Sequence, residues 1–254
     1  MIDLHCHILP GIDDGPKTIE ESMELARAAE ADGIHTLIAT PHHRNGAYDN
    51  PGDTIPHLVD YVNRVIKNSQ IDVTVLPGQE NRITGELLEE LQQGTAIPLN
   101  HSRYVFVEFS SVQVPQYTSR LFFDMQVEGY VPIIVHPERN QTFLEHPNKL
   151  YELIKGGALT QVTAHCFTKK APKKARQFAE LLLDHQMLHL VATDAHDVKN
   201  RPFDLSKAYR FMESKQGEEE IFYLMDNAQR IAENEDIYPE PPERVKKKKF
   251  LGIF

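Results

Sequence analysis

The sequence has few cysteines and no long apolar segment, and both absences limit where the protein can work. Its 254 residues include only two cysteines, Cys6 and Cys166, which form neither a CxxC pair nor a zinc-type cluster. Two thiols do not make a disulfide framework, so a reducing compartment suits the chain. No apolar run has the length of a membrane helix, and polar residues from position 3 leave no room for a secretory leader. We therefore expect a cytoplasmic protein.

Positive charge and phosphate-binding loops are also scarce. The chain has 27 Lys and Arg against 37 Asp and Glu, a net charge of −10. This balance argues against duplex nucleic acid as a partner, because a phosphate backbone requires a positive surface. Neither GxGxxG nor GxxxxGK[ST] occurs, so the nucleotide-binding α/β folds would lack their phosphate loops.

Short β-rich runs alternate with segments of helical character. Thr18 and Glu21 match a capping box for a helix that stops at Gly33, Pro115 begins another that ends at Gly129, and 171–186 is amphipathic. The alternation predicts parallel βαβ units, and seven strands favour one barrel-like (β/α) domain, with a doubly wound open sheet as the alternative. The predicted strands are 2–6, 34–40, 72–78, 103–109, 131–137, 159–165 and 188–194.

Candidate metal ligands recur at the ends of these strands. His5 and His7 are two residues apart, so on a strand both imidazoles face the same side and Cys6 faces the other. In a chain with 13 histidines this pair alone is weak evidence. Strand ends of a parallel barrel, however, converge on one face, and unpaired buried charges there would be costly. The recurrence therefore predicts a metal site, with the further candidates His42 or His43, Glu80, Glu108, His136, Asp194 and His196.

Four motifs together resemble a known group of enzymes. They are His-x-His at 5–7, TPHH at 40–43, HPER at 136–139 and DAH at 194–196. The set resembles the polymerase and histidinol phosphatase (PHP) superfamily. Across essentially the whole chain it is most similar to the manganese-dependent protein-tyrosine phosphatases of bacterial capsule and exopolysaccharide loci. The resemblance implies a distorted (β/α)7 TIM-like barrel of the PHP fold with three Mn ions, although the mixed ligands would also suit Fe or Zn.

The resemblance also implies a role for individual residues. The first metal would be held by His5, His7, Glu80 and Asp194; the second by Glu80, Glu108 and His136; the third by Asp14, His42 and His196. Arg139 and Arg201 follow ligand-bearing strands, and a guanidinium group can bind phosphate with two hydrogen bonds, although either could be an ordinary surface arginine. Asp13 and His43 would support their neighbours rather than bind metal directly.

The implied activity is removal of phosphate from tyrosines of a bacterial tyrosine kinase and related proteins, which would regulate capsular or extracellular polysaccharide synthesis. A metal-activated water would attack the phosphate. No cysteine nucleophile is then needed, and the Cys-x5-Arg signature is absent: Ile12 and Pro172 stand where its arginine would follow each cysteine. Two alternatives are a phosphatase for histidinol phosphate or another small phosphomonoester, and a nonenzymatic, metal-stabilised regulator that binds phosphotyrosine.

The C-terminal segment differs in composition from the rest. We expect a catalytic domain at 1–238 and a tail at 239–254, because Pro239, Pro241 and Pro242 precede a basic run from Lys246 to Lys249. The tail would be either solvated or an anchor for an acidic membrane surface or a kinase. His165, at the end of the sixth strand, would line or tune the pocket, and Cys166 would be structural.

Overall fold

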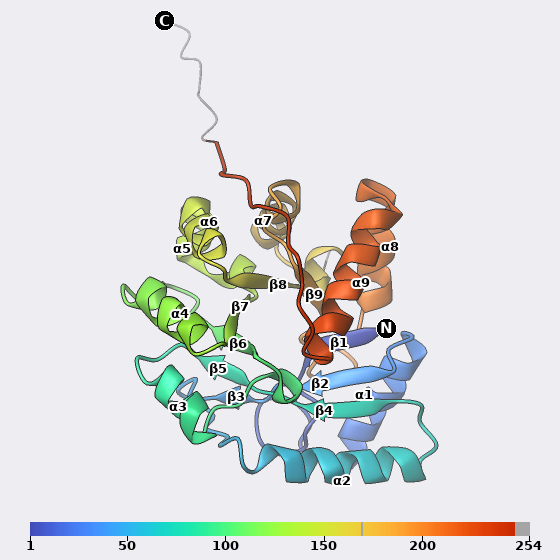
Figure 1. Ribbon diagram of the computed structural model, residues 1–254. Helices are drawn as coiled ribbons and strands as arrows, with labels where there is room; N and C mark the ends of the chain where they lie inside the picture. Colours follow the sequence, from blue (N-terminus) through green and yellow to red (C-terminus); the bar gives the residue numbers. More distant parts are fainter. Residues whose placement is uncertain (169, 247–254) are drawn as a thin grey trace, which may run out of the picture.

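The computed structural model describes residues 1–168 and 170–246 and consists of parallel strands flanked by helices (Figure 1). One sheet has three strands in the order β1-β2-β4, and the other has six in the order β3-β5-β6-β7-β8-β9. All the strand pairs are parallel, as predicted. The strands are β1 Ile2–Cys6, β2 Thr36–Ala39, β3 His42–His43, β4 Thr74–Pro77, β5 Glu80–Arg82, β6 Tyr104–Glu108, β7 Val131–Val135, β8 Leu159–Thr163 and β9 Leu190–Ala192.

Two of the predicted strands continue into short extra strands that pair in the other sheet. The chain passes from β2 to β3 through Thr40 and Pro41, and from β4 to β5 through Gly78 and Gln79. At Gly78 the neighbouring strand comes so close that a Cβ atom would lie 2.6 Å from Cγ2 of Ile38, so a larger residue would not fit without movement. Because of these bends, β2 and β4 pair in the three-stranded sheet, whereas their continuations β3 and β5 pair in the six-stranded sheet.

The strand order decides between the two predicted architectures. Neighbouring strands follow the order of the chain with no reversal, whereas a doubly wound sheet reverses its order at a switch point. The amide of Asp194 donates to the carbonyl of His5 at 2.8 Å, and the amide of His7 donates to the carbonyl of Ala195 at 2.8 Å. These bonds join β1 to the segment that follows β9. The barrel-like alternative is therefore the correct one.

The helices cover the outside of the strands, and the sequence located three of them by their residues: α1, α4 and α7. Thr18 caps α1 by accepting a hydrogen bond from the amide of Glu21 at 3.4 Å, as predicted. The helix predicted from Pro115 instead begins at Thr118, whose amide and hydroxyl both donate to the Pro115 carbonyl in a preceding turn. The helices are α1 Ile19–Ala31, α2 Ile55–Asn68, α3 Leu87–Gln93, α4 Thr118–Val127, α5 Gln141–Glu145, α6 Pro147–Lys155, α7 Lys173–Asp184, α8 Leu205–Gln216 and α9 Glu218–Ala232, with short 3₁₀ turns at Leu99–His101, Pro137–Arg139 and Ala164–Cys166.

Apolar side chains form a layer under the helices and a separate core inside the barrel. Phe106 and Ile133 are fully buried in the inner core, whereas Val107 and Ile134 belong to the outer layer. This alternation is the two-residue period of a strand with one face inward. A register shift between Asp3 and Cys6 interrupts it, so that Leu4 joins the inner core while the His5 ring also lies 5.1 Å from Phe106.

The segment after α9 leads from the inner core of the barrel to the helices α6 and α7. Ile237 packs against the inner core, and the amide of Glu243 donates to the carbonyl of His185 just after α7. Val245 then exchanges two hydrogen bonds of 3.0 Å with the side chain of Asn148 at the start of α6. Residues 247–254, which include most of the basic run, lie outside the described part of the chain. Among the described helices, none combines the length and apolarity that crossing a membrane requires.

Candidate metal centre

Glu80 lies at the middle of the strand-end cluster. Its Oε2 atom is 3.4 Å from Nε2 of both His5 and His7. Asp194 completes this group, since its Oδ1 atom is 3.5 Å from Nε2 of His5 and 3.4 Å from Nε2 of His7. The first predicted ligand group is thus assembled from the ends of β1, β5 and β9.

The other carboxylate oxygen of Glu80 belongs to a second group. Glu80 Oε1 is 2.6 Å from His136 Nε2, and His42 Nδ1 is 2.8 Å from Glu80 Oε2 and 3.8 Å from Glu108 Oε2. The donor atoms that lie within 4.8 Å of one another here are those of His42, Glu80 and Glu108. His136 joins this group through Glu80, and it lines one cavity together with Glu108. The sequence assigned His42 to the third group alone, because it gave no sign that both ring nitrogens would face carboxylates.

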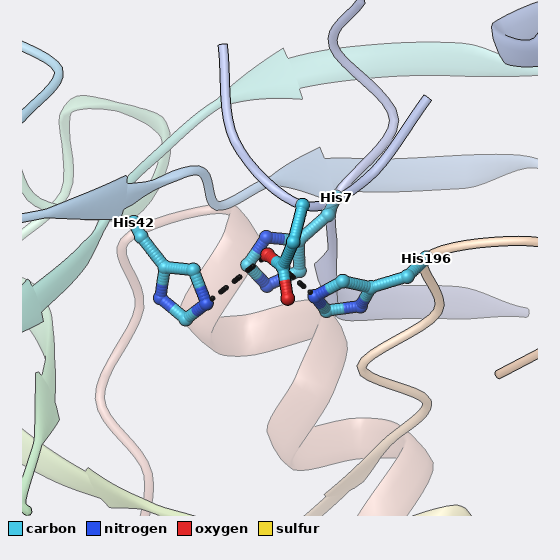
Figure 2. Close-up of side chains that lie close together, drawn as sticks. His7, His42 and His196 are labelled. Atoms are coloured by element: carbon cyan, nitrogen blue, oxygen red, sulfur yellow. Dashed lines mark ion pairs between the residues drawn. The ribbon is translucent and has the colours of Figure 1, made fainter. Parts of the chain in front are cut away.

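The third group surrounds Asp14. Its Oδ1 atom is 3.4 Å from His42 Nε2 and 3.2 Å from His196 Nε2. Figure 2 shows His7 between His42 and His196, and the His7 and His196 rings stack with their centroids 3.8 Å apart. Four donor atoms, from His7, Asp14, His42 and His196, lie within 4.8 Å of one another.

Two of the ligand candidates have an unusual backbone conformation. His136 has a φ of 35° and Asp194 a φ of 55°, both in the left-handed region that residues other than glycine rarely occupy. His136 directly follows β7, and Asp194 follows β9 after one intervening residue, Thr193. At each position the sharp change of backbone direction places the side chain in the cluster. Such conformations are retained where the surrounding structure enforces them, and they concentrate at functional sites.

Three neighbouring groups fix the orientation of the histidines. Asp13 Oδ2 is 2.6 Å from His7 Nδ1, and Asp13 Oδ1 accepts a hydrogen bond from the amide of Gly15 at 2.9 Å. Gly15 lies so close to His7 that a Cβ atom would be 2.3 Å from the His7 carbonyl oxygen. Gln161 Oε1 is 3.0 Å from His5 Nδ1. With these contacts the Nε2 atoms of both histidines face the centre of the cluster.

Both candidate arginines converge on one oxygen of Asp194. Arg139 Nη2 is 2.6 Å from Asp194 Oδ2 and donates to Thr163 Oγ1 at 3.0 Å. Arg201 Nη2 also donates to Asp194 Oδ2, and its Nη1 atom is 3.7 Å from Asp14 Oδ2. The two guanidinium groups are partly exposed, so they flank the cluster on its open side.

Sequence analysis missed three residues that contact the cluster or its arginines. Arg82 Nη2 is 3.4 Å from Glu108 Oε2, Gln161 contacts His5, and Thr163 contacts Arg139. Each follows from strand alternation once the register is known: Arg82 is two residues after Glu80 on β5, and Gln161 and Thr163 share the inward face of β8. The alternation is present in the sequence, but on a strand as short as β5 or as fully buried as β8 it does not show which polar residues face the site.

The donor atoms fit divalent cations. Six of those facing the centre are buried and have no hydrogen-bond partner within the described residues, and buried polar atoms are otherwise nearly always paired. Carboxylate oxygen and imidazole nitrogen together suit manganese, iron and zinc. The partnerless atoms are His5 Nε2, His7 Nε2, His42 Nδ1, Glu80 Oε2, Glu108 Oε2 and His196 Nε2.

The charges of the cluster also favour cations. Burial opposes ionisation of Glu80, but the positive charges of His5 and His42 outweigh it and hold the Glu80 pKa well below its usual range. Burial raises the pKa of Glu108, and the nearby charge of Glu80 raises it further. For Asp194 burial is likewise outweighed, here chiefly by Arg139, so its pKa is far below the usual range. Several carboxylates thus share one buried volume, where positive charge is required.

Other candidates lie outside the cluster. His43 faces Asp49 at 3.2 Å, away from the centre. His165 Nε2 is 3.2 Å from the carbonyl of Pro202, on the loop that carries Arg201, and within the described part of the chain it contacts no ligand candidate. Cys166 is buried, with Sγ 3.7 Å from Glu138 Oε1, and burial strongly raises its thiol pKa, so it is not an activated thiolate.

Known proteins resemble this chain along its full length. YwqE of Bacillus subtilis, a tyrosine-protein phosphatase, is 41% identical over 254 residues and 100% of both chains. CapC of Staphylococcus aureus, a putative tyrosine-protein phosphatase, is 35% identical over 254 residues and 100% of both chains. CpsB of Streptococcus pneumoniae, also a tyrosine-protein phosphatase, is 30% identical over 237 residues, which are 91% of this chain and 98% of that one.

Solved structures give the same result. A crystal structure from work on YwqE and CpsB, described as unique metal-dependent tyrosine phosphatases, superposes with a TM-score of 0.95 at 41% identity and covers 97% of this chain and 100% of that one. A mutant organophosphorus hydrolase from Deinococcus radiodurans shares the fold alone, with a TM-score of 0.56, 14% identity and coverage of 89% and 91%. The sequence profile of the capsular polysaccharide synthesis family CpsB/CapC matches residues 1–233. The chain belongs to the CpsB/CapC family.

Proposed function

We propose that this protein is a metal-dependent protein-tyrosine phosphatase that hydrolyses phosphotyrosine on a bacterial tyrosine kinase and related proteins, and thereby regulates capsular or extracellular polysaccharide synthesis. The observation that supports it most strongly is the buried set of partnerless nitrogen and oxygen atoms around Glu80, next to two partly exposed arginines. A site built only to bind phosphotyrosine would not need so many inward-facing ligand atoms without partners.

We assign the ligands of three manganese ions to the three groups around Glu80 and Asp14. Iron or zinc would also accept this donor set. When bound, such ions supply Lewis acidity, lower the pKa of water and offset charge on the phosphoryl oxygens. The assigned ligands are His5, His7, Glu80 and Asp194 for the first ion, Glu80, Glu108 and His136 for the second, and Asp14, His42 and His196 for the third.

The protein's own residues position the substrate and the ligands. Arg139 and Arg201 would hold nonbridging phosphoryl oxygens, since each guanidinium offers several N–H donors in a fixed plane. Thr163 and Asp194 supply acceptors that keep the Arg139 side chain near the cluster. Asp13 keeps Nδ1 of His7 occupied, which leaves Nε2 to face the centre. Both cysteines are buried and take no part in this scheme.

The remaining parts of the proposal concern the whole chain. We propose that residues 1–238 form the catalytic domain and 239–254 a tail, and that the protein works in the cytoplasm. The tail's basic run would contact the kinase or an acidic membrane surface. Residues 243–245, which precede the run, are held against α6 and α7 and would fix where it leaves the domain.

A comparison of turnover tests the proposed function. The purified protein with manganese is given a phosphotyrosyl peptide, the matching phosphoseryl peptide and histidinol phosphate, and released phosphate is measured for each. We expect the phosphotyrosyl peptide to have the highest kcat/KM, and activity to disappear on chelation and return with manganese. A preference for histidinol phosphate would reject the protein-phosphatase assignment. Activity that persists in protein shown by elemental analysis to be free of metal would reject the metal-dependent mechanism.

A further inference from the structure

His165 is a mostly buried polar residue that the proposed reaction does not use. It lies in the 3₁₀ turn after β8, and its side chain is 14% exposed. Its Nε2 atom is 3.2 Å from the carbonyl oxygen of Pro202, the residue after Arg201. Burial lowers the pKa of His165, so at neutral pH the uncharged ring has a single N–H group, and it donates to this carbonyl. His165 therefore ties the end of β8 to the loop that carries Arg201.

A buried ion pair joins the same two segments. The side chain of Asp204 is 1% exposed, and its Oδ2 atom pairs with Nζ of Lys170, in the loop that follows the turn with His165. The other oxygen, Oδ1, is 2.6 Å from Nζ of Lys207. Asp204 Oδ2 also lies 3.7 Å from His165 Nε2. A buried carboxylate would be costly without such partners, so these contacts fix the end of the loop that carries Arg201. We call His165, Lys170 and Asp204 the loop clamp.

The backbone of Arg201 is held on both sides. Its carbonyl accepts hydrogen bonds from the amides of His196 at 2.9 Å and Asp197 at 3.4 Å, which close the loop in front of it. Behind it, Phe203 is buried in the outer apolar layer. The guanidinium group, in contrast, belongs to a side chain that is 32% exposed. The position of the loop therefore determines where this partly exposed side chain can reach.

The placement of Arg201 matters because its guanidinium lies between two carboxylates of the metal centre. Nη2 donates to Asp194 Oδ2, and Nη1 is 3.7 Å from Asp14 Oδ2. Asp194 and Asp14 belong to different ligand groups, so the guanidinium bridges the two at the open side of the cluster. Hydrogen bonds weaken steeply with distance and angle, and a displacement of about 1 Å can lower a rate about 10²-fold. A small shift of the loop would therefore reduce the contribution of Arg201.

We propose that His165 is a positioning residue: as part of the loop clamp it holds the loop of Arg201 so that the guanidinium meets the phosphoryl group of the substrate. The proposal rests on the proposed function, which assigns phosphate binding to Arg201. If His165 only stabilised the fold, its replacement would have the same effect with or without Arg201. A positioning role predicts instead that the effect disappears once Arg201 has been replaced, because the clamp then has no guanidinium to place.

A double-mutant cycle separates the two roles. The Kd of inorganic phosphate is measured by calorimetry on the manganese-loaded full chain, for the unsubstituted protein, His165→Ala, Arg201→Ala and the double variant. His165→Gln keeps an N–H donor near the position of Nε2. His185→Ala is the matched control, because His185 is also partly buried and its Nδ1 atom is 2.9 Å from a backbone carbonyl, that of Leu181 in α7. Circular dichroism and metal content are measured on the same samples.

We expect His165→Ala to weaken phosphate binding about 2-fold to 13-fold, the range that corresponds to the loss of one hydrogen bond. Arg201→Ala should weaken it more, and adding His165→Ala to Arg201→Ala should have no further effect. His165→Gln should keep most of the affinity, and His185→Ala should keep all of it. The proposal would be overturned by an equal effect of His165→Ala in both backgrounds, by no effect in either, or by a loss in His165→Gln as large as in His165→Ala.

The remaining outcomes also decide the question. If His165→Ala does not fold or loses its metal, His165→Leu fills similar space without a donor and should show the same loss and the same dependence on Arg201. Loss of fold or metal in both variants would make His165 a structural residue and overturn the proposal. Phosphate binding that Arg201→Ala leaves unchanged would reject the role of Arg201 and the positioning role with it. Failure of the proposed function would appear separately, as intact coupling in a protein that does not hydrolyse the phosphotyrosyl peptide.

Discussion

Asp13 is a single residue whose effect reaches the metal centre through His7. Asp13→Asn removes the negative charge 2.6 Å from His7 Nδ1, so His7 should become a weaker and less well oriented ligand. We expect metal affinity to fall by roughly 10-fold to 100-fold, the usual loss when such a partner is removed. Competition with a fluorescent chelator measures it. Asp72→Asn is the matched control, because Asp72 is 3.1 Å from His35 in an exposed His–Asp pair and should leave metal affinity unchanged; an equal effect of both substitutions would refute the role of Asp13.

Arg139 is the second residue whose role can be isolated. Arg139→Lys keeps one positive charge but loses the planar group that contacts Thr163 and Asp194, so kcat/KM on a phosphotyrosyl peptide should fall on the order of 10² to 10³. Arg120→Lys, on the outer surface of α4, should have no effect. Metal content and folding are measured in the same samples, since loss of either would imitate the result. Near-normal turnover by folded, metallated Arg139→Lys would remove Arg139 from the mechanism.

At this scale the sequence predicted which residue types would gather, but not how each atom would be used. Alternation along a strand places His5 and His7 on one side, and in the structure Nε2 of both residues faces the same oxygen of Glu80. The sequence could not show that His42 has a carboxylate near each ring nitrogen, because that depends on β3 pairing with β5. It missed Arg82 for a different reason: β5 has three residues, too few for a recognisable pattern.

Among the elements, the segment that ends at Val245 is held to α6 by one side chain. Asn148 both donates to and accepts from the Val245 backbone, at 3.0 Å each, so Asn148→Ala removes two hydrogen bonds of about 0.5 to 1.5 kcal/mol apiece. Exchange of the Val245 amide should become roughly 5-fold to 150-fold faster. Hydrogen exchange followed by mass spectrometry measures it, with Lys149→Ala, an exposed neighbour on α6, as the control. Unchanged protection in Asn148→Ala would show that other contacts hold the segment.

The seven main strands and the helices α1, α4 and α7 were predictable because their patterns are local. Each long strand is a continuous buried run, and the cap of α1 comes from the residues of its own first turn. The bends between β2 and β3 and between β4 and β5 were not, since they arise where neighbouring strands approach, as at Gly78. The local pattern also misplaced the start of α4, because a proline favours a turn as readily as a first helical residue.

At the scale of the whole molecule, folding stability should depend on the titration of His189. This residue is buried in the wall of the barrel, where the Thr160 amide donates to its Nδ1 atom at 3.1 Å, and burial lowers its pKa from 6.5 to about 4. Between these two values the unfolded chain binds the proton and the folded protein does not. Stability is therefore fully present above pH 6.5 and falls as the pH decreases toward 4, by up to about 3 kcal/mol from this group.

Urea unfolding of the metal-free protein at pH 7, 5.5 and 4.5 measures this dependence. His189→Gln should lose less stability between pH 7 and 4.5 than the unsubstituted protein does, whatever its stability at pH 7. His57→Gln, an exposed substitution, should follow the unsubstituted protein. The same pH dependence in all three would show that His189 does not contribute.

The partnerless atoms around Glu80 also affect how long the protein survives in a cell. They leave the metal-free fold with buried polar groups that form no hydrogen bond among the described residues, whereas bound ions stabilise the folded state by an amount that grows with the logarithm of their concentration. A larger unfolded fraction is degraded faster by cellular proteases. Metal starvation should therefore shorten the half-life of this protein and lower its abundance, so that metal supply determines the number of molecules present as well as the activity of each.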